Sequence, residues 1–339
     1  MAQQIKKLIK KAVRVAMPAP EPSAAPAVPA NRPWSVADNA TENPWTIDVH
    51  GRTHRFFFIT GCYKSGTHWV QNLLNLHPAV NVKGEFHFDT LQRGYEAMVN
   101  THWYLSARPR LRPTADASYH DFVRRMMWTE TRDKPGATWL GDRTPRLLNE
   151  ILPGAPVINI RRDGRDVMVS WNFHHLRAQR VDNLLPQMRE TAERIGPEFR
   201  DHPERFHAAG TGFLAEEWWF RHHARVWAGM ITRELEEAPR MLERGTRLLR
   251  IAYEDMHADV HSARRQLFDH LGLKESDAAP LSHETRTLPG FSEESPTKFY
   301  RKGATGEWKD MFTDRQKQWF KDEAGAALIA AGYEKDGHW

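Results

Sequence analysis

The chain contains a single cysteine, Cys62, among its 339 residues. One thiol can form neither an internal disulfide nor a cysteine-based metal cluster, so packing and polar contacts must hold the fold together. A lack of disulfides is typical of proteins in a reducing compartment. We therefore expect a cytoplasmic protein.

The sequence also lacks long apolar runs. No stretch of about eighteen consecutive apolar residues occurs, which excludes a membrane-spanning helix. Hydrophobic residues nevertheless make up 40% of the chain. This is enough apolar material for a core in one large domain, or in one domain with appendages.

Most of the chain lacks an excess of charge of either sign. The sequence has 48 Lys and Arg residues against 43 Asp and Glu residues, a net charge of +5. Residues 1–17 hold five of the cations and no acid, so the rest of the chain is balanced. The positive charge thus belongs to the N-terminal segment and gives no support to a domain that binds nucleic acid.

Residues 1–17 place apolar side chains and cations at helical spacing. The apolar positions are Ile5, Leu8, Ile9, Ala12, Val13 and Ala16, and the cations are Lys6, Lys7, Lys10, Lys11 and Arg14. A helix with this pattern is amphipathic and could make peripheral contact with an anionic membrane surface. A solvated tail is the alternative.

Residues 18–54 follow as a proline- and alanine-rich linker and lead-in. Prolines occupy six positions between residues 18 and 33, which is typical of a semi-extended linker. We expect the folded chain to begin between Trp34 and Arg55, and we assign residues 55–339 to one domain.

The rest of the chain alternates between strand and helix patterns. The run at 56–60 has no polar alternation, which is typical of a strand buried on both faces. The other predicted strands are 138–141, 156–160 and 248–251, and the predicted helices are 69–77, 165–178, 213–238, 260–271 and 313–331. Such alternation predicts an α/β fold with a central parallel sheet flanked by helices, in which ligands bind at the carboxyl ends of the strands.

Strand 56–60 runs into a loop with the sequence Gly61-Cys62-Tyr63-Lys64-Ser65-Gly66-Thr67-His68-Trp69. A strand, a glycine-containing turn and a helix start direct several backbone N–H groups to one point, where the helix dipole adds positive potential. Lys64 adds a cation, and Ser65 and Thr67 add hydroxyl groups. We predict an anion site here; an ordinary turn with a hydroxyl helix cap is the alternative.

The loop differs from that of the nucleoside triphosphatases, which have a lysine directly after the second glycine. Here Lys64 precedes Gly66. Strand 156–160 ends in Arg161 and Arg162, where a magnesium-binding acid would be required. Both features favour an anion site without a metal.

Segment 63–69 resembles the 5′-phosphosulfate loop of sulfotransferases that use 3′-phosphoadenosine 5′-phosphosulfate (PAPS), which usually reads Y-P-K-[SA]-G-T-T-W. Tyr63 stands in place of the proline and His68 in place of the second threonine. The resemblance implies that Trp69 stacks on the adenine. The donor-binding residues that it implies in this segment are Lys64, Ser65, Gly66, Thr67, His68 and Trp69.

Three further segments resemble this family. Arg162 and Ser170 fit its 3′-phosphate pattern R-[DN]-x-[RK]-D-x-x-x-S, and Tyr253 lies in a Y-E-D segment whose tyrosine lies near the adenine. Segment 301–309 resembles R-K-G-x-x-G-[DE]-W-K, which implies phosphate contacts for Arg301, Lys302 and Gly303. The resemblance covers residues 55–332 and implies a single P-loop-like domain, with PAPS as cosubstrate and no metal.

Sulfuryl transfer needs a cation near the leaving oxygen and a base for the proton of the acceptor. Lys64 is the candidate cation, with Arg143 as a possible helper. The cytosolic branch of the family has a histidine in a K-T-H segment, which is absent from the corresponding residues 142–145. The resemblance to Golgi carbohydrate and tyrosylprotein sulfotransferases implies Glu85 as the base, with His87 as the alternative.

The sequence does not identify the acceptor: a hydroxyl or amine of a carbohydrate, a lipid or a small molecule fits. We expect residues 89–135 and 172–215 to form the acceptor pocket and its lid. Candidate wall residues are Tyr95, Trp103, Tyr104, Trp128, Phe173, His174 and His175. Two other classes remain open: a P-loop kinase-like phosphotransferase that requires magnesium, and a non-catalytic nucleotide-binding protein at a membrane surface.

Overall fold

The computed structural model of the chain describes residues 43–144, 151–177, 184–289 and 303–339. Residues 1–17, with their predicted membrane contact, lie outside these ranges, as do Arg301 and Lys302. No helix within the described ranges is long and apolar enough to cross a membrane.

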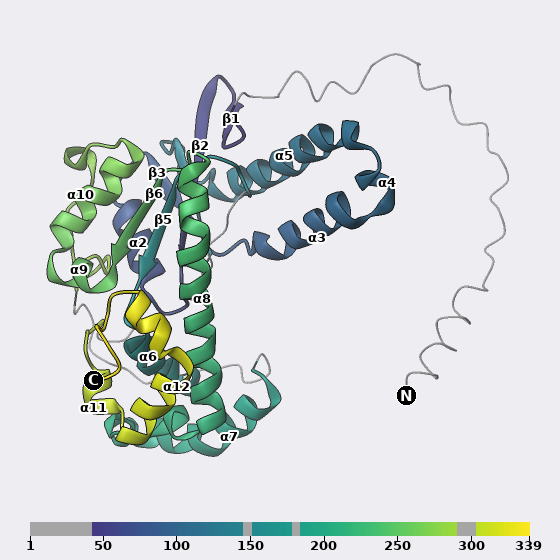
Figure 1. The fold of residues 1–339 in the computed structure, drawn as a ribbon. Helices are drawn as coiled ribbons and strands as arrows, with labels where there is room; N and C mark the ends of the chain where they lie inside the picture. The colour runs from purple at the N-terminus through teal and green to yellow at the C-terminus, as the bar shows by residue number, and fades with distance from the viewer. Residues whose placement is uncertain (1–42, 145–150, 178–183, 290–302) are drawn as a thin grey trace, which may run out of the picture. The chain divides into compact units, whose positions relative to one another are not determined.

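A six-stranded sheet in the order β3-β4-β2-β5-β6, with β1 paired to β2, lies at the centre of the domain (Figure 1). The strands that run parallel to their neighbours are β2 (Arg52–Gly61), β3 (Val80–Val82), β4 (Trp139–Arg143), β5 (Val157–Arg161) and β6 (Leu248–Ala252). Strand β1 (Thr46–Val49) pairs with β2 in the antiparallel direction. The predicted α/β fold with a central parallel sheet is confirmed.

The sheet begins earlier than the predicted domain start at residue 55. Residues 46–54, which the sequence places in the lead-in, form β1 and the first part of β2. In this hairpin Thr46 pairs with Arg55 and Val49 with Arg52. Ile47 is buried against the sheet, so this part of the lead-in belongs to the folded domain.

Helices account for most of the remaining described residues. Those of nine residues or more are α2 (Thr67–Asn75), α3 (Phe88–Thr101), α5 (Arg112–Thr131), α6 (Gly164–Leu176), α7 (Pro186–Asp201), α8 (Glu217–Glu243), α10 (Val260–Leu271) and α12 (Asp314–Ala330). The shorter ones are α4 (Trp103–Ser106), α9 (Tyr253–Ala258) and α11 (Trp308–Met311).

Strand β2 is buried on both faces because its side chains alternate between two cores. Phe57 and Ile59 lie in a core with residues of α2 and α10. Phe56 and Phe58 lie in a second core, with residues of α5 and α8. A third core joins α6, α7, α8 and α12. The predicted burial of run 56–60 is therefore correct, and the sheet is covered by helices on both sides.

The long helix predicted at 213–238 is wrong at both ends. Residues 212–215 form a short 3₁₀ turn, and α8 starts only at Glu217. At the other end α8 continues past Pro239 to Glu243. A proline inside a helix removes one hydrogen bond, but Ala238 and Met241 on either side of it are buried, and their packing compensates for that loss.

Helices α3 and α5 are not foreseen by the sequence patterns. They form a pair that Figure 1 shows at one side of the sheet. The ring of Tyr95 on α3 stacks on that of Tyr119 on α5, with centroids 4.3 Å apart. Apart from Phe88 at the start of α3, both elements fall within residues 89–135, which the sequence assigns to the acceptor region.

Candidate functional site

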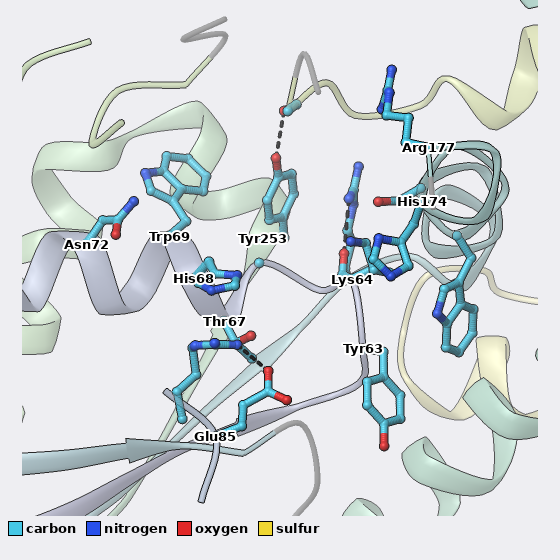
Figure 2. A pocket seen from close by; sticks show the side chains of 16 residues that line it. Tyr63, Lys64, Thr67, His68, Trp69, Asn72, Glu85, His174, Arg177 and Tyr253 are labelled. Carbon is cyan, nitrogen blue, oxygen red and sulfur yellow. Dashed lines mark hydrogen bonds and ion pairs between the residues drawn. The ribbon is translucent and has the colours of Figure 1, made fainter. Parts of the chain in front are cut away.

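A pocket of about 430 Å³ lies at the carboxyl ends of the parallel strands. Its lining comes from the loop after β2, from α2, from the ends of β4 and β5, and from α6 and α9 (Figure 2). The lining residues are Tyr63, Lys64, Gly66, Thr67, His68, Trp69, Asn72, Glu85, Arg143, Arg162, Ser170, Trp171, His174, Arg177, Tyr253 and Gly303.

The loop between β2 and α2 has an unusual backbone that fixes the shape of the pocket. Lys64 and Gly66 both have positive φ angles, 65° and 98°. A Cβ atom at Gly66 would lie 2.6 Å from the ring of Tyr253, so a larger residue there would displace this ring. Glycine is therefore required for the loop to approach α9.

Charges of one sign dominate this pocket. Its lining contains four cations, Lys64, Arg143, Arg162 and Arg177, against the single carboxylate of Glu85. Burial is the main reason why the pKa of Lys64 is lowered to about 8, and the neighbouring guanidinium groups, above all that of Arg162, contribute to this shift. Repulsion of this kind arises where a protein binds a multiply charged anion.

Arg162 lies at the end of β5 and is 5% exposed. Its guanidinium donates to the backbone oxygen of Lys64 at 3.2 Å and to that of Ala304 at 2.7 Å. The same group stacks over the ring of Tyr253 at 4.2 Å. The hydroxyl of Tyr253 donates to the backbone oxygen of Gly303 at 2.7 Å. Arg162 and Tyr253 together therefore join the loop between β2 and α2, which we call the phosphate loop, to segment 303–308.

Glu85 and Arg143 form an ion pair at the other side of the phosphate loop. Arg143 Nη1 lies 2.5 Å from Glu85 Oε1, and Arg143 Nε donates to Gln71 Oε1 at 2.7 Å. The second oxygen of Glu85 lies 3.3 Å from His87 Nε2. This network fixes the guanidinium of Arg143 at the mouth of the pocket.

The structure brings most of the predicted site residues together, although they come from six separate segments. The predicted residues that line the pocket are Lys64, Gly66, Thr67, His68, Trp69, Glu85, Arg143, Arg162, Ser170, Tyr253 and Gly303. Trp69 is held by a bond from its Nε1 to the oxygen of Thr287 at 3.2 Å and by an edge contact with Tyr253.

Two predicted residues do not line the pocket. The side chain of Ser65 is fully buried beneath the loop, and its amide donates to the oxygen of Cys62. The side chain of His87 is 57% exposed and contacts the site only through Glu85. Two further predicted residues, Arg301 and Lys302, lie outside the described part of the chain.

The pocket includes few residues of the two regions that we expect to form the acceptor side. None of residues 89–135 is among the pocket residues, because α3 and α5 pack on another part of the sheet. Among the described residues of region 172–215, His174 and Arg177 alone contribute. Phe173 is fully buried in the core beside α6, which is why its ring does not reach the pocket.

Five lining residues are absent from the site that the motifs predict: Tyr63, Asn72, Trp171, His174 and Arg177. Of these, His174 is expected from the sequence only as a candidate wall residue of the acceptor pocket. Helical spacing could have found three of them. Asn72 follows His68 by one turn, and His174 and Arg177 follow Ser170 by one and two turns. Residues spaced in this way share one face of a helix, so one motif residue that faces a ligand predicts the others.

The described residues contain no group of three His, Cys, Asp or Glu side chains that could hold a metal ion. The lone thiol, Cys62, is buried. Burial raises the pKa of the Cys62 thiol far above its ordinary value, so it is unsuited to ligand binding or nucleophilic chemistry.

Among solved structures, the chain is similar to a mouse sulfotransferase complexed with PAP, with 16% identity over 84% of this chain and 95% of that one and a TM-score of 0.41. It is also similar to a sulfotransferase from Alicyclobacillus acidocaldarius, with 19% identity over 82% of this chain and 95% of that one and a TM-score of 0.40. No curated protein sequence matches the chain.

The family assignment rests on the sequence itself. A model of the sulfotransferase domain matches residues 55–328, nearly the whole span in which the resemblance was predicted. The matched span contains the loop after β2, the unit from β5 to α6 and α9, which together build the pocket. The chain therefore belongs to the sulfotransferase domain family.

Proposed function

We propose that this sulfotransferase transfers the sulfuryl group of PAPS to a hydroxyl or amine of its acceptor and releases 3′,5′-adenosine bisphosphate (PAP). One observation carries the proposal. Lys64, in the loop after β2, lines the same pocket as Arg162 and Ser170, which belong to the unit from β5 to α6. Two separate cationic groups in one pocket suit a ligand with two separate anionic groups.

The residues present fit this donor in charge and shape. The excess of lining cations over carboxylates offsets the negative charge of a phosphosulfate and a 3′-phosphate. Trp69 and Tyr253, whose ring centroids lie 5.4 Å apart, offer aromatic surfaces for a purine. Gly303 closes the same side through its bond from Tyr253.

Lys64 and Arg143 are the groups that can stabilise the transferring charge. When PAPS is bound, it supplies the sulfuryl group and a nucleotide leaving group. Lys64 places a cation where negative charge grows on the leaving oxygen, which lowers the barrier to transfer. Arg143 is held in position by Gln71 and Glu85, so it provides a second fixed cation without reorganisation.

Calorimetry with PAP and 5′-AMP tests the donor assignment. Since AMP lacks the 3′-phosphate, we expect PAP to bind more tightly by on the order of a hundredfold. Arg162→Ala should remove most of this preference, whereas Arg265→Ala, at an exposed position of α10, should keep it. Equal affinity for both nucleotides, or preferential binding of ATP with magnesium, would refute the proposal.

A further inference from the structure

His174 is a pocket residue to which no motif gives a role. It lies on α6 one turn after Ser170, and both side chains line the pocket. Figure 2 shows its ring beside the segment of Lys64, across the cavity from Glu85. The imidazole therefore lies close to the cation that we assign to the leaving oxygen.

The surroundings of His174 keep its imidazole neutral. Burial is the main reason why its pKa is lowered to about 4, and the cations of Lys64 and Arg177 contribute to this shift. The other ionisable groups of the pocket lining are Tyr63, His68, Glu85, Arg143, Arg162 and Tyr253, and the ring of His175 contacts that of His174 with centroids 5.6 Å apart. A neutral imidazole has a nitrogen lone pair that can accept a proton.

Glu85, the base implied by the sequence, is engaged in other contacts. One of its oxygens lies 2.5 Å from Arg143 Nη1, and the other lies 3.3 Å from His87 Nε2. A proton arriving from an acceptor would have to displace one of these partners. In this geometry Glu85 orients the guanidinium of Arg143. Glu85 is therefore a positioning residue.

We propose that His174 is the general base that accepts the proton of the acceptor hydroxyl during sulfuryl transfer. This inference rests on the proposed function. The acceptor oxygen forms a bond to sulfur while the bond from sulfur to the bridging oxygen of PAPS breaks, and that electron pair stays on the nucleotide phosphate. The proton of the hydroxyl moves to the imidazole of His174 and later to solvent.

Donor binding prepares the imidazole for this task. In the empty pocket the cations disfavour a further positive charge on His174. The negative charge of PAPS offsets these cations, so the proton affinity of the imidazole rises when the donor is bound. A base works best when its pKa lies near the working pH, so a rise of the His174 pKa on donor binding favours proton transfer to the imidazole.

The test uses PAPS with a radiolabelled sulfuryl group, phenol as the added acceptor and water as the acceptor that is always present. The total rate of label loss from PAPS is measured at several pH values. His174→Ala and His174→Phe should lower this rate at neutral pH by on the order of a hundredfold, with PAP affinity within about twofold of the original. Added imidazole should restore part of the rate of His174→Ala.

Two comparisons distinguish a catalytic role of His174 from a structural one. The loss of rate below neutral pH in the original chain should disappear in His174→Phe, because a structural role would not move the pH profile. His261→Ala, at an exposed position of α10, should change nothing. Rates of the His174 variants within about threefold of the original, or a loss that imidazole does not restore, would overturn the proposal.

The same experiment separates this inference from the proposed function. If the original chain does not bind PAP, the donor assignment fails. If PAP binds normally and Glu85→Gln alone removes the acid limb of the pH profile, the base is Glu85 and the role of His174 is wrong.

Discussion

The pKa of a single residue in this pocket depends on its burial and on how close the neighbouring cations lie. Arg162 donates to the backbone of Lys64 itself, at 3.2 Å. Burial and this guanidinium lower the pKa of Lys64 to about 8, well below that of a solvated lysine. Without a bound donor, Lys64 therefore loses its positive charge within a pH range that experiments can reach. Donor binding stabilises this charge.

Lys64 should make donor affinity depend on pH. A group whose pKa is lowered to about 8 carries its charge below that pH and loses it above. We expect the affinity for PAP to fall by on the order of tenfold between about pH 7.5 and 9.5, where the phosphates of PAP no longer titrate. Calorimetry over this range measures it.

Two variants control this experiment. Lys64→Met should bind PAP weakly at every pH in the range, and Lys64→Arg should show no such decline, since arginine keeps its charge. If the decline persists in Lys64→Met, another group titrates and the role of Lys64 is wrong.

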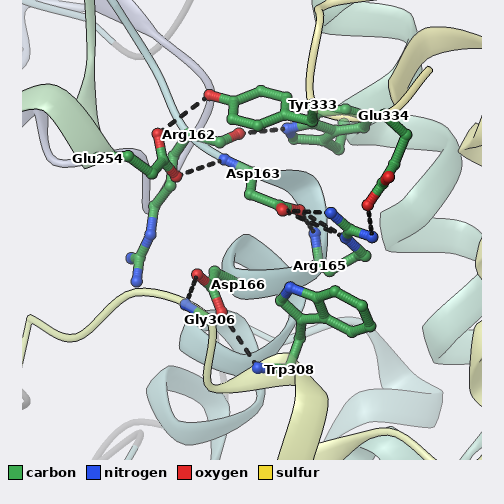
Figure 3. Close-up of polar contacts among 10 residues, drawn as sticks. Arg162, Asp163, Arg165, Asp166, Glu254, Gly306, Trp308, Tyr333 and Glu334 are labelled. Carbon is green, nitrogen blue, oxygen red and sulfur yellow. Dashed lines mark hydrogen bonds and ion pairs between the residues drawn. The ribbon is translucent and has the colours of Figure 1, made fainter. Parts of the chain in front are cut away.

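At the scale of elements, the start of α6 holds segment 303–308 in place. The carboxylate of Asp166 accepts from the amide of Gly306 at 2.6 Å and from that of Trp308 at 3.1 Å (Figure 3). Arg165 stacks over the ring of Trp308 at 3.8 Å and pairs with Glu334 at 2.6 Å. These contacts fix the segment that meets Arg162 and Tyr253.

Asp166 acts on the donor through segment 303–308 and not by direct contact. Removal of its carboxylate should therefore weaken donor binding. Asp166→Ala leaves the amides of Gly306 and Trp308 without their acceptor, which costs about 1–3 kcal/mol for each buried group. We expect PAP affinity to fall by roughly tenfold or more and amide hydrogen exchange in residues 303–311 to accelerate. The control Asp269→Ala, at an exposed position, should alter neither. Unchanged exchange in that segment would contradict this role.

At the scale of the whole molecule, several histidines are held in the neutral form. Burial is the main cause in each case, and it lowers the pKa values of His68, His174, His223 and His270 to about 4. The pKa of His175 is lowered in the same direction. In the unfolded chain such groups titrate near pH 6.5.

The domain should consequently lose stability in mild acid. Between about pH 6.5 and 4 the unfolded chain binds protons that the folded chain does not, so the free energy of unfolding falls as the pH falls, by at most about 1.4 kcal/mol per pH unit for each histidine. Burial raises the pKa of Asp142 to about 6 and also raises the pKa values of Asp166 and Glu254. These carboxyls act in the opposite sense but are fewer than the histidines whose pKa values are lowered. Urea unfolding at about pH 7.5, 6 and 5 measures the trend.

One variant tests whether a buried histidine contributes to the predicted loss of stability in mild acid. His270→Asn cannot bind the extra proton, so its free energy of unfolding should fall less steeply between pH 6.5 and 4. A free energy of unfolding that stays constant from pH 7.5 to 5 would contradict the account of buried neutral histidines.

The sequence by itself determined the fold class and the family, and its motifs named most of the residues that line the pocket. A buried run such as 56–60 and the loop with Lys64 depend on neighbours in the chain, so local patterns predict them. The same holds for α10, whose bounds match the prediction. Local patterns failed where packing decides: α8 continues past Pro239, and residues 46–54 join the sheet as a hairpin.

Only the tertiary structure decided which side chains share the pocket. Ser65 and Lys64 are neighbours in the loop, yet Ser65 is buried beneath it and Lys64 faces the cavity. Glu85 and Arg143 lie far apart in the sequence, and they meet because β3 and β4 are adjacent parallel strands. His174 gained its place from the position of α6 beside the phosphate loop. The physical reason is that a motif records contacts along the chain, whereas burial, ion pairs and the resulting pKa values arise from segments that only the fold brings together.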